Sequence, residues 1–179
     1  INFRLSADEV AYIVNNSESQ LLITSRAKLE VAREALKLCP QVKLCLVVDG
    51  GDLVAPFQDY ARATAAYPDT PIADEALGTA MLYSSGTTGR PKGILRPLPE
   101  TPPSEPLPLF HFLHKLWRYR ENMIYLSPAP MYHSAPNAAV SLTLGVGGTV
   151  VIMEHFDPEM YLSLIETYKV THSQLVPTM

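Results

Sequence analysis

The chain has 179 residues, of which 47% are hydrophobic, so it can bury a real core as one domain or two small ones. Its 14 basic residues against 18 acidic ones give a net charge of −4, which offers no electrostatic support for binding nucleic acid. No apolar run approaches the roughly 20 residues that span a bilayer. Because Cys39 and Cys45 form neither a C-x-x-C pair nor a metal-spaced cluster, we expect free thiols in a reducing cytoplasm.

The first half of the chain alternates predicted helices and strands. In chain order we expect a helix over residues 6–14, a strand over 20–24, a helix over 26–38, a strand over 43–48 and a third helix over 54–66. Ser6 and Glu9 have the spacing of a capping box, and Ser25 is the expected cap of the second helix. Strands that are continuous apolar runs between helices indicate a parallel sheet covered on both faces.

The second half repeats this alternation. We expect a strand over residues 123–126, a helix of small residues over 138–144, a strand over 148–153, a helix over 158–168 and a strand from 170 to 176. Asp157 and Pro158 have the residue types preferred at the N-cap and at the first helical position. The last strand has no closing element and the first residue is not Met, so we expect a piece of a larger protein.

The most informative motif is Y-S-S-G-T-T-G-R-P-K-G, at residues 83–93. Its glycines let the backbone approach an anion closely, its hydroxyls donate hydrogen bonds, and its lysine adds a positive charge. Such a combination predicts that the loop binds the phosphates of a nucleotide. The residues expected at the nucleotide are Ser84, Ser85, Gly86, Thr87, Thr88, Gly89 and Lys92.

The spacing of this motif differs from that of a P-loop NTPase. Lys92 does not directly follow the second glycine, and Pro91 disfavours helical backbone at Arg90. Short apolar runs flank the motif at residues 80–83 and 93–95, so we expect the loop to connect two strands. A generic surface turn is the alternative, but such turns rarely gather four hydroxyls, three glycines, a proline and a lysine in eleven positions.

This motif resembles the phosphate-loop signature of the adenylate-forming superfamily, which includes acyl-CoA synthetases, firefly-type luciferases and adenylation domains of peptide synthetases. The opening N-F-R-L and the segments at residues 156–159 and 176–178 are similar to other stretches of these enzymes. The resemblance implies an α/β fold, part of the doubly wound N-terminal domain with a mixed or parallel sheet. We expect an α/β part over 1–78, a phosphate-loop hairpin over 79–96, a Pro-rich loop over 97–108 and a second α/β part over 109–179, without the C-terminal lid domain.

The resemblance also implies a function, the ATP-dependent activation of a carboxylic acid to an acyl-adenylate, with Mg²⁺ accompanying the ATP and CoA as the later cosubstrate. In acyl-CoA synthetases a P-x-[FY]-H segment puts its histidine beside the carboxylate, and His133 matches that position. No acidic residue lies between Asn122 and Met153 to pair with an α-ammonium group, which favours a fatty or other non-amino acid. The alternative for His133 is a structural histidine that caps the following helix.

Several alternatives stay open at this point. The protein could be a luciferase-like or aryl-acid ligase, or a nucleotide-binding scaffold without catalysis. The family's later motifs, including the adenylation lysine, are not found here, so we assign no catalytic residue or metal ligand and expect the chain alone to be inactive and to self-associate.

Three further features have ordinary interpretations. His111 and His114 have metal-compatible spacing on a predicted helix without a visible third ligand. Residues 96–102 fit an SH3-type ligand pattern that arises readily in Pro-rich loops. A last group of basic side chains is typical of a solvated helix face rather than a CoA contact, and comprises Lys115, Arg118 and Arg120.

Overall fold

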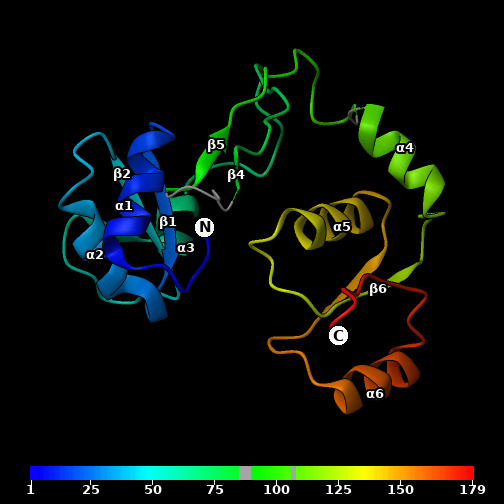
Figure 1. Ribbon diagram of the computed structural model, residues 1–179. Coiled ribbons are helices and arrows are strands. Elements are labelled where there is room, and N and C mark those ends of the chain that lie inside the picture. Colours follow the sequence, from blue (N-terminus) through cyan, green and yellow to red (C-terminus); the bar gives the residue numbers. More distant parts are fainter. Residues whose placement is uncertain (85–89, 106–107) are drawn as a thin grey trace. The chain divides into compact units, whose positions relative to one another are not determined.

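The computed structural model describes residues 1–84, 90–105 and 108–179 (Figure 1). The chain divides into two compact units, Ile1–Pro103 and Ser104–Met179. Each unit contains a three-stranded parallel sheet with helices, and the first also carries an antiparallel hairpin. The finer division expected from the sequence, with a Pro-rich loop over 97–108, stays a prediction.

The first unit is built around the sheet β1-β2-β3. Its elements are α1 (Ala7–Asn16), β1 (Leu21–Ser25), the 3₁₀ helix η1 (Arg26–Lys28), α2 (Leu29–Leu36), β2 (Leu44–Val48), β3 (Phe57–Asp59), α3 (Tyr60–Thr64), β4 (Leu82–Ser84) and β5 (Lys92–Ile94). The parallel register places Leu22, Cys45 and Phe57 in one row across the three strands.

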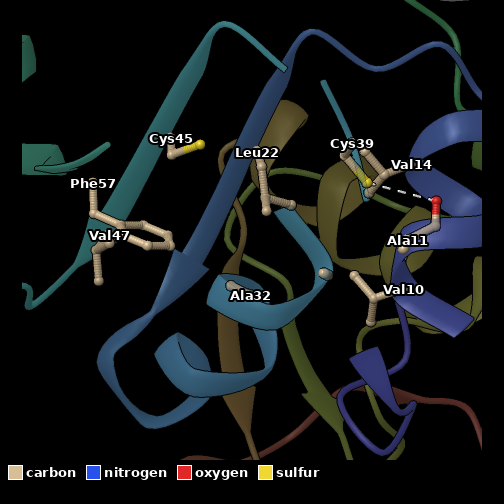
Figure 2. Packing of buried hydrophobic residues seen from close by; sticks show 10 residues of the cluster. Val10, Ala11, Val14, Leu22, Ala32, Cys39, Cys45, Val47 and Phe57 are labelled. Carbon is tan, nitrogen blue, oxygen red and sulfur yellow. Dashed lines mark hydrogen bonds between the residues drawn. The ribbon is translucent and has the colours of Figure 1, made fainter. Parts of the chain in front are cut away.

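One face of this sheet forms the core of the unit (Figure 2). The row of Leu22, Cys45 and Phe57 belongs to a buried cluster with residues of α1 and α2, and the Cys39 thiol donates to the Ala11 carbonyl at 3.7 Å. On the opposite face Leu21 and Ile23 are 47% and 49% exposed. On the same face Leu46 of β2 is 5% exposed, so this face is covered at the central strand β2 and partly open at β1.

Of the two helix caps predicted for the first unit, one is present in the structure and the other is not. The capping box is confirmed, with Glu9 N–H donating to Ser6 Oγ at 3.4 Å and Ser6 N–H donating to Glu9 Oε2 at 2.8 Å. Ser25 was expected to cap a helix over 26–38, but its side chain makes no capping hydrogen bond. Instead the segment starts as the 3₁₀ turn η1 and continues as α2 only to Leu36.

The expected helix over 54–66 is wrong in its first half. Pro56 disfavours helical backbone at Ala55, and Phe57 is 5% exposed as part of the sheet, so this stretch becomes β3. Asp59 then caps the short helix α3, because its carboxylate accepts from the Arg62 N–H at 2.9 Å. Burial of an aromatic side chain against two strands outweighs local helix propensity here.

The second unit has the strand order β7-β6-β8, with β6 parallel to both neighbours. Its elements are α4 (Pro108–Leu116), β6 (Ile124–Ser127), α5 (Ser134–Gly145), β7 (Thr149–Ile152), α6 (Pro158–Tyr168) and β8 (His172–Ser173). Met123 and Tyr125 are buried with Ala139 and Val140 of α5, which packs on this sheet. In the part of the chain that the structure describes, no helix is long and apolar enough to cross a membrane.

Local signals locate α6 correctly and the neighbouring elements less well. Asp157 accepts from the Met160 N–H at 2.7 Å and Pro158 occupies the first turn, as predicted. Helix α5 begins at Ser134, four residues before the expected start, because Pro136 lies in the first turn where its missing N–H costs no hydrogen bond. The final strand shortens to β8, where the Ser173 hydroxyl donates to the Leu126 carbonyl at 2.8 Å.

Candidate nucleotide-binding site

The described part of the glycine-rich motif forms a two-stranded antiparallel hairpin (Figure 1). Ser84 at the end of β4 pairs with Lys92 at the start of β5, and both side chains are exposed. The prediction that the loop connects two strands is therefore confirmed. The remaining residues assigned to the nucleotide lie outside the described residues, and these are Ser85, Gly86, Thr87, Thr88 and Gly89.

Gly93 is required by the packing of the hairpin. It lies opposite Tyr83 in the register, and a Cβ atom built on it would be 2.9 Å from Cζ and 3.0 Å from the hydroxyl of Tyr83, as well as in conflict with the Met81 methyl group. The tyrosine ring therefore lies across the glycine, where no side chain fits. This gives Gly93 a steric role, whereas the sequence suggested close approach of an anion.

Helix α1 makes hydrogen bonds to both sides of the hairpin, to Tyr83 of β4 and to Pro91, which directly precedes β5. The Tyr83 hydroxyl donates to Asn16 Oδ1 at 2.7 Å, and the Tyr12 hydroxyl donates to the Pro91 carbonyl at 2.9 Å. Burial raises the pKa of Tyr83, so its hydroxyl remains a donor at neutral pH. The Arg90 guanidinium lies 5.1 Å from the centroid of the Tyr12 ring. Sequence reasoning missed these contacts, and the only local signal is that Tyr12 and Asn16 share a helix face.

His133 lies between the carboxyl end of β6 and the first residue of α5. The carboxyl ends of parallel strands are the usual ligand-binding edge of such sheets, and β6 is the central strand. The exposed His133 side chain makes no capping hydrogen bond, which argues against the structural alternative of a helix cap. Its ring centroid lies 4.3 Å from that of Tyr132. The imidazole is thus available at a helix N-terminus, where anions are favoured.

The strand that leads to His133 is mostly buried. Tyr125 is 2% exposed and Ser127 is fully buried, with its hydroxyl 3.8 Å from the Met131 sulfur. Burial raises the pKa of Tyr125 to about 12, so this phenol stays protonated at neutral pH and is no candidate for a general base. The exposed His133 thus follows a strand whose own polar side chains are buried.

The described residues offer no alternative metal site. His111 and His114 both belong to α4, and no group of three or more His, Cys, Asp or Glu residues comes together within 1–84, 90–105 and 108–179 in a way that could hold a metal ion.

Comparison with known proteins agrees with this architecture. The model of the family "AMP-binding enzyme" matches residues 1–179. The 4-hydroxybutyrate–CoA ligase 2 of Metallosphaera sedula is 28% identical over 199 residues, covering 99% of this chain and 33% of the relative. The inhibitor-bound N-terminal domain of FACL13 from Mycobacterium tuberculosis has a TM-score of 0.74 and 26% identity, covering 99% of this chain and 43% of that one. For ATP-bound MatB from Rhodopseudomonas palustris the TM-score is 0.71, with 25% identity over 99% of this chain and 34% of that one.

The fold is thus that of part of the N-terminal α/β domain of an adenylate-forming enzyme. The chain belongs to the AMP-binding enzyme family. It spans about a third of the length of the curated relatives that it matches.

Proposed function

We propose that the protein containing this chain activates a carboxylic acid with ATP and transfers the acyl group to CoA. The observation that carries this proposal is the complete signature at residues 83–93, mounted on a hairpin that pairs Ser84 with Lys92. Membership of the AMP-binding family and similarity to CoA ligases support it. A structural relative has been solved with ATP bound, which supports ATP as the nucleotide in this proposal.

The chemistry explains why such a loop is needed. A carboxylate is a poor electrophile, so its oxygen attacks the α-phosphorus of ATP, the bond to the bridging oxygen breaks, and pyrophosphate leaves. Negative charge accumulates on the departing phosphates, and we assign its stabilisation to the Lys92 ammonium and the Ser84 hydroxyl, which belong to residues paired in the hairpin register. The thiol of CoA then attacks the acyl-adenylate and expels AMP, which completes a thioester.

For the substrate we propose a fatty or other carboxylic acid without an α-amino group. The N-terminus of α5 and the free His133 ring favour an anion at this position. An α-ammonium group would need a carboxylate partner, and residues 122–153 contain none. His133 therefore binds the substrate carboxylate, and Lys92 binds the nucleotide phosphates.

Acid-dependent exchange of pyrophosphate into ATP by the full-length protein tests this function. Fatty, aryl and amino acids would be compared at equal concentration, and we expect exchange with acids that lack the α-amino group. Exchange with amino acids alone would contradict the substrate assignment. Tight ATP binding without exchange for any acid would instead identify a nucleotide-binding protein without ligase activity.

A further inference from the structure

Helix α1 presents two polar side chains to the hairpin. Tyr12 and Asn16 are four residues apart and so lie on one helix face. Tyr12 donates to the Pro91 carbonyl at 2.9 Å, and Asn16 accepts from the Tyr83 hydroxyl at 2.7 Å. Each bond joins residues that are distant in sequence, 79 and 67 positions apart. One helix face therefore contacts β4, at Tyr83, and the residue directly before β5, Pro91.

Both contacts end one residue before the pair expected at the phosphates. Pro91 precedes Lys92, Tyr83 precedes Ser84, and Ser84 pairs with Lys92 in the hairpin register. An isolated two-stranded hairpin is only marginally stable in water, and each of these strands has three residues. The orientation of Ser84 and Lys92 must therefore come from packing, and the hydroxyl contacts to α1 provide it.

We propose that Tyr12 and Asn16 are positioning residues for nucleotide binding, acting on Lys92 and Ser84 through the backbone of the hairpin. This inference rests on the proposed role of Lys92 at the ATP phosphates. Removal of the Tyr12 hydroxyl alone leaves the ring in place, and with it the 5.1 Å contact of the Arg90 guanidinium. The variant Tyr12→Phe therefore tests the hydrogen bond to Pro91 without removing the packing of the ring.

The experiment measures two properties of full-length variants, the affinity for ATP and the rate of thioester formation. For Tyr12→Phe and for Asn16→Ala we expect ATP affinity, measured by calorimetric titration, to fall by about three- to tenfold, the usual effect of one hydrogen bond. Thioester formation from supplied acyl-adenylate should be unchanged, because pyrophosphate takes no part in that step. The control Tyr67→Phe, at a side chain that is 76% exposed, should leave ATP affinity and thioester formation unchanged. Equal losses of ATP affinity and of thioester formation would overturn the positioning role and indicate a general structural defect.

A double-mutant cycle shows whether the effect acts through Lys92. In the background of Lys92→Ala, we expect Tyr12→Phe to weaken ATP binding by less than about twofold, because coupled residues are not additive. The same fold loss in both backgrounds would overturn the inference. If Lys92→Ala weakens ATP binding while Tyr12→Phe and Asn16→Ala do not, the positioning role fails and the function of the hairpin stands. If Lys92→Ala binds ATP with unchanged affinity, both proposals fail.

Discussion

Lys92 is the one charged side chain among the residues assigned to the nucleotide. Lys92 lies opposite Ser84, both side chains are exposed, and the motif around them contributes hydroxyls and glycines. A compact ammonium group suits phosphate oxygens as a point charge, and its contribution is larger than that of a neutral donor. At the scale of single residues, the loss of this charge should therefore dominate other changes in the hairpin.

The variant Lys92→Ala in the full-length protein should weaken adenylation and spare the second half-reaction. Losing a charge-assisted contact to phosphate costs about 1.5–3 kcal/mol, and pyrophosphate is absent from thioester formation. Exchange of labelled pyrophosphate measures the first step, and CoA consumption from supplied acyl-adenylate measures the second. Lys43→Ala removes an exposed lysine of the same unit and should affect neither step. A loss shared by both steps would assign Lys92 to folding or to adenylate binding.

The variant Gly93→Ala should destabilise the hairpin. Its new methyl group would meet the Tyr83 ring at 2.9 Å, and overpacking of this kind costs about 1–3 kcal/mol. Gly78→Ala is the matched control, since a Cβ atom there has no neighbour within 4 Å. Thermal unfolding of the two variants should separate them, with a lowered midpoint for Gly93→Ala only. Equal midpoints would show that the tyrosine ring moves aside without cost.

The part of the candidate site that can be predicted from the sequence is the part whose signal is local. The spacing of glycines, hydroxyls and Lys92 within 83–93 is sufficient to predict a phosphate loop between two strands. Tyr12 and Asn16 carried no comparable signal, because their partners are 79 and 67 positions away and a tyrosine on an amphipathic helix is usually a packing residue. Only the fold brings α1 against the hairpin.

At the scale of elements, helix α1 depends on a reciprocal cap. Ser6→Ala removes the acceptor of the Glu9 N–H and should lower the free energy of unfolding by about 1 kcal/mol. Ser25→Ala is a useful comparison, because Ser25 also precedes a helical segment but makes no capping bond, and its effect should stay within about 0.5 kcal/mol. Denaturant titration of both variants checks the difference. A larger loss for Ser25→Ala would contradict the assignment of the caps.

The same cap makes stability depend on pH. The pKa of Glu9 is lowered mainly by the hydrogen bond from the Ser6 N–H and to a smaller extent by the hydrogen bond from the Ser6 hydroxyl. Because the pKa of Glu9 is lower in the folded state than in the unfolded state, its ionised form stabilises the fold at pH values above the unfolded pKa of about 4.3. This stabilisation is lost as the pH falls through the folded pKa. We therefore expect Glu9→Gln to be less stable than the unsubstituted protein at pH 7 and equally stable in stronger acid. Glu75 is exposed and lies outside the helices and strands, so Glu75→Gln is the control. A difference that persists unchanged at low pH, or that also appears for Glu75→Gln, would contradict this.

Elements were predicted well where the deciding residues are adjacent in sequence. Asp157 and Pro158 determine the start of α6, and Ser6 with Glu9 that of α1, within four positions. The segment over 54–66 was mispredicted because the deciding contact is tertiary, with Phe57 paired to Cys45 of β2. Local propensity contains no information about such a partner.

At the scale of the molecule, both units expose apolar sheet faces and edges. Leu21 and Ile23 of the first unit are about half exposed, as are Ile152 of β7 and Leu175 beyond β8 in the second. Open apolar strands pair readily with other chains. We expect the isolated 179-residue chain to self-associate and to bind ATP weakly. Sedimentation with ATP titration checks both points, and a monodisperse monomer with micromolar affinity, about −8 kcal/mol, would contradict them.

The contact between α1 and the hairpin also implies an effect in the reverse direction. Binding equilibria are reciprocal, so a helix that favours the nucleotide-binding geometry of the hairpin must itself be stabilised when ATP is bound. Amide protons of Tyr12, Ile13 and Asn16 in the full-length protein should then exchange more slowly with solvent deuterium in the presence of ATP. In Tyr12→Phe this protection should shrink, so the first helix of the chain would report on the occupancy of a site nearly 80 residues further along the sequence.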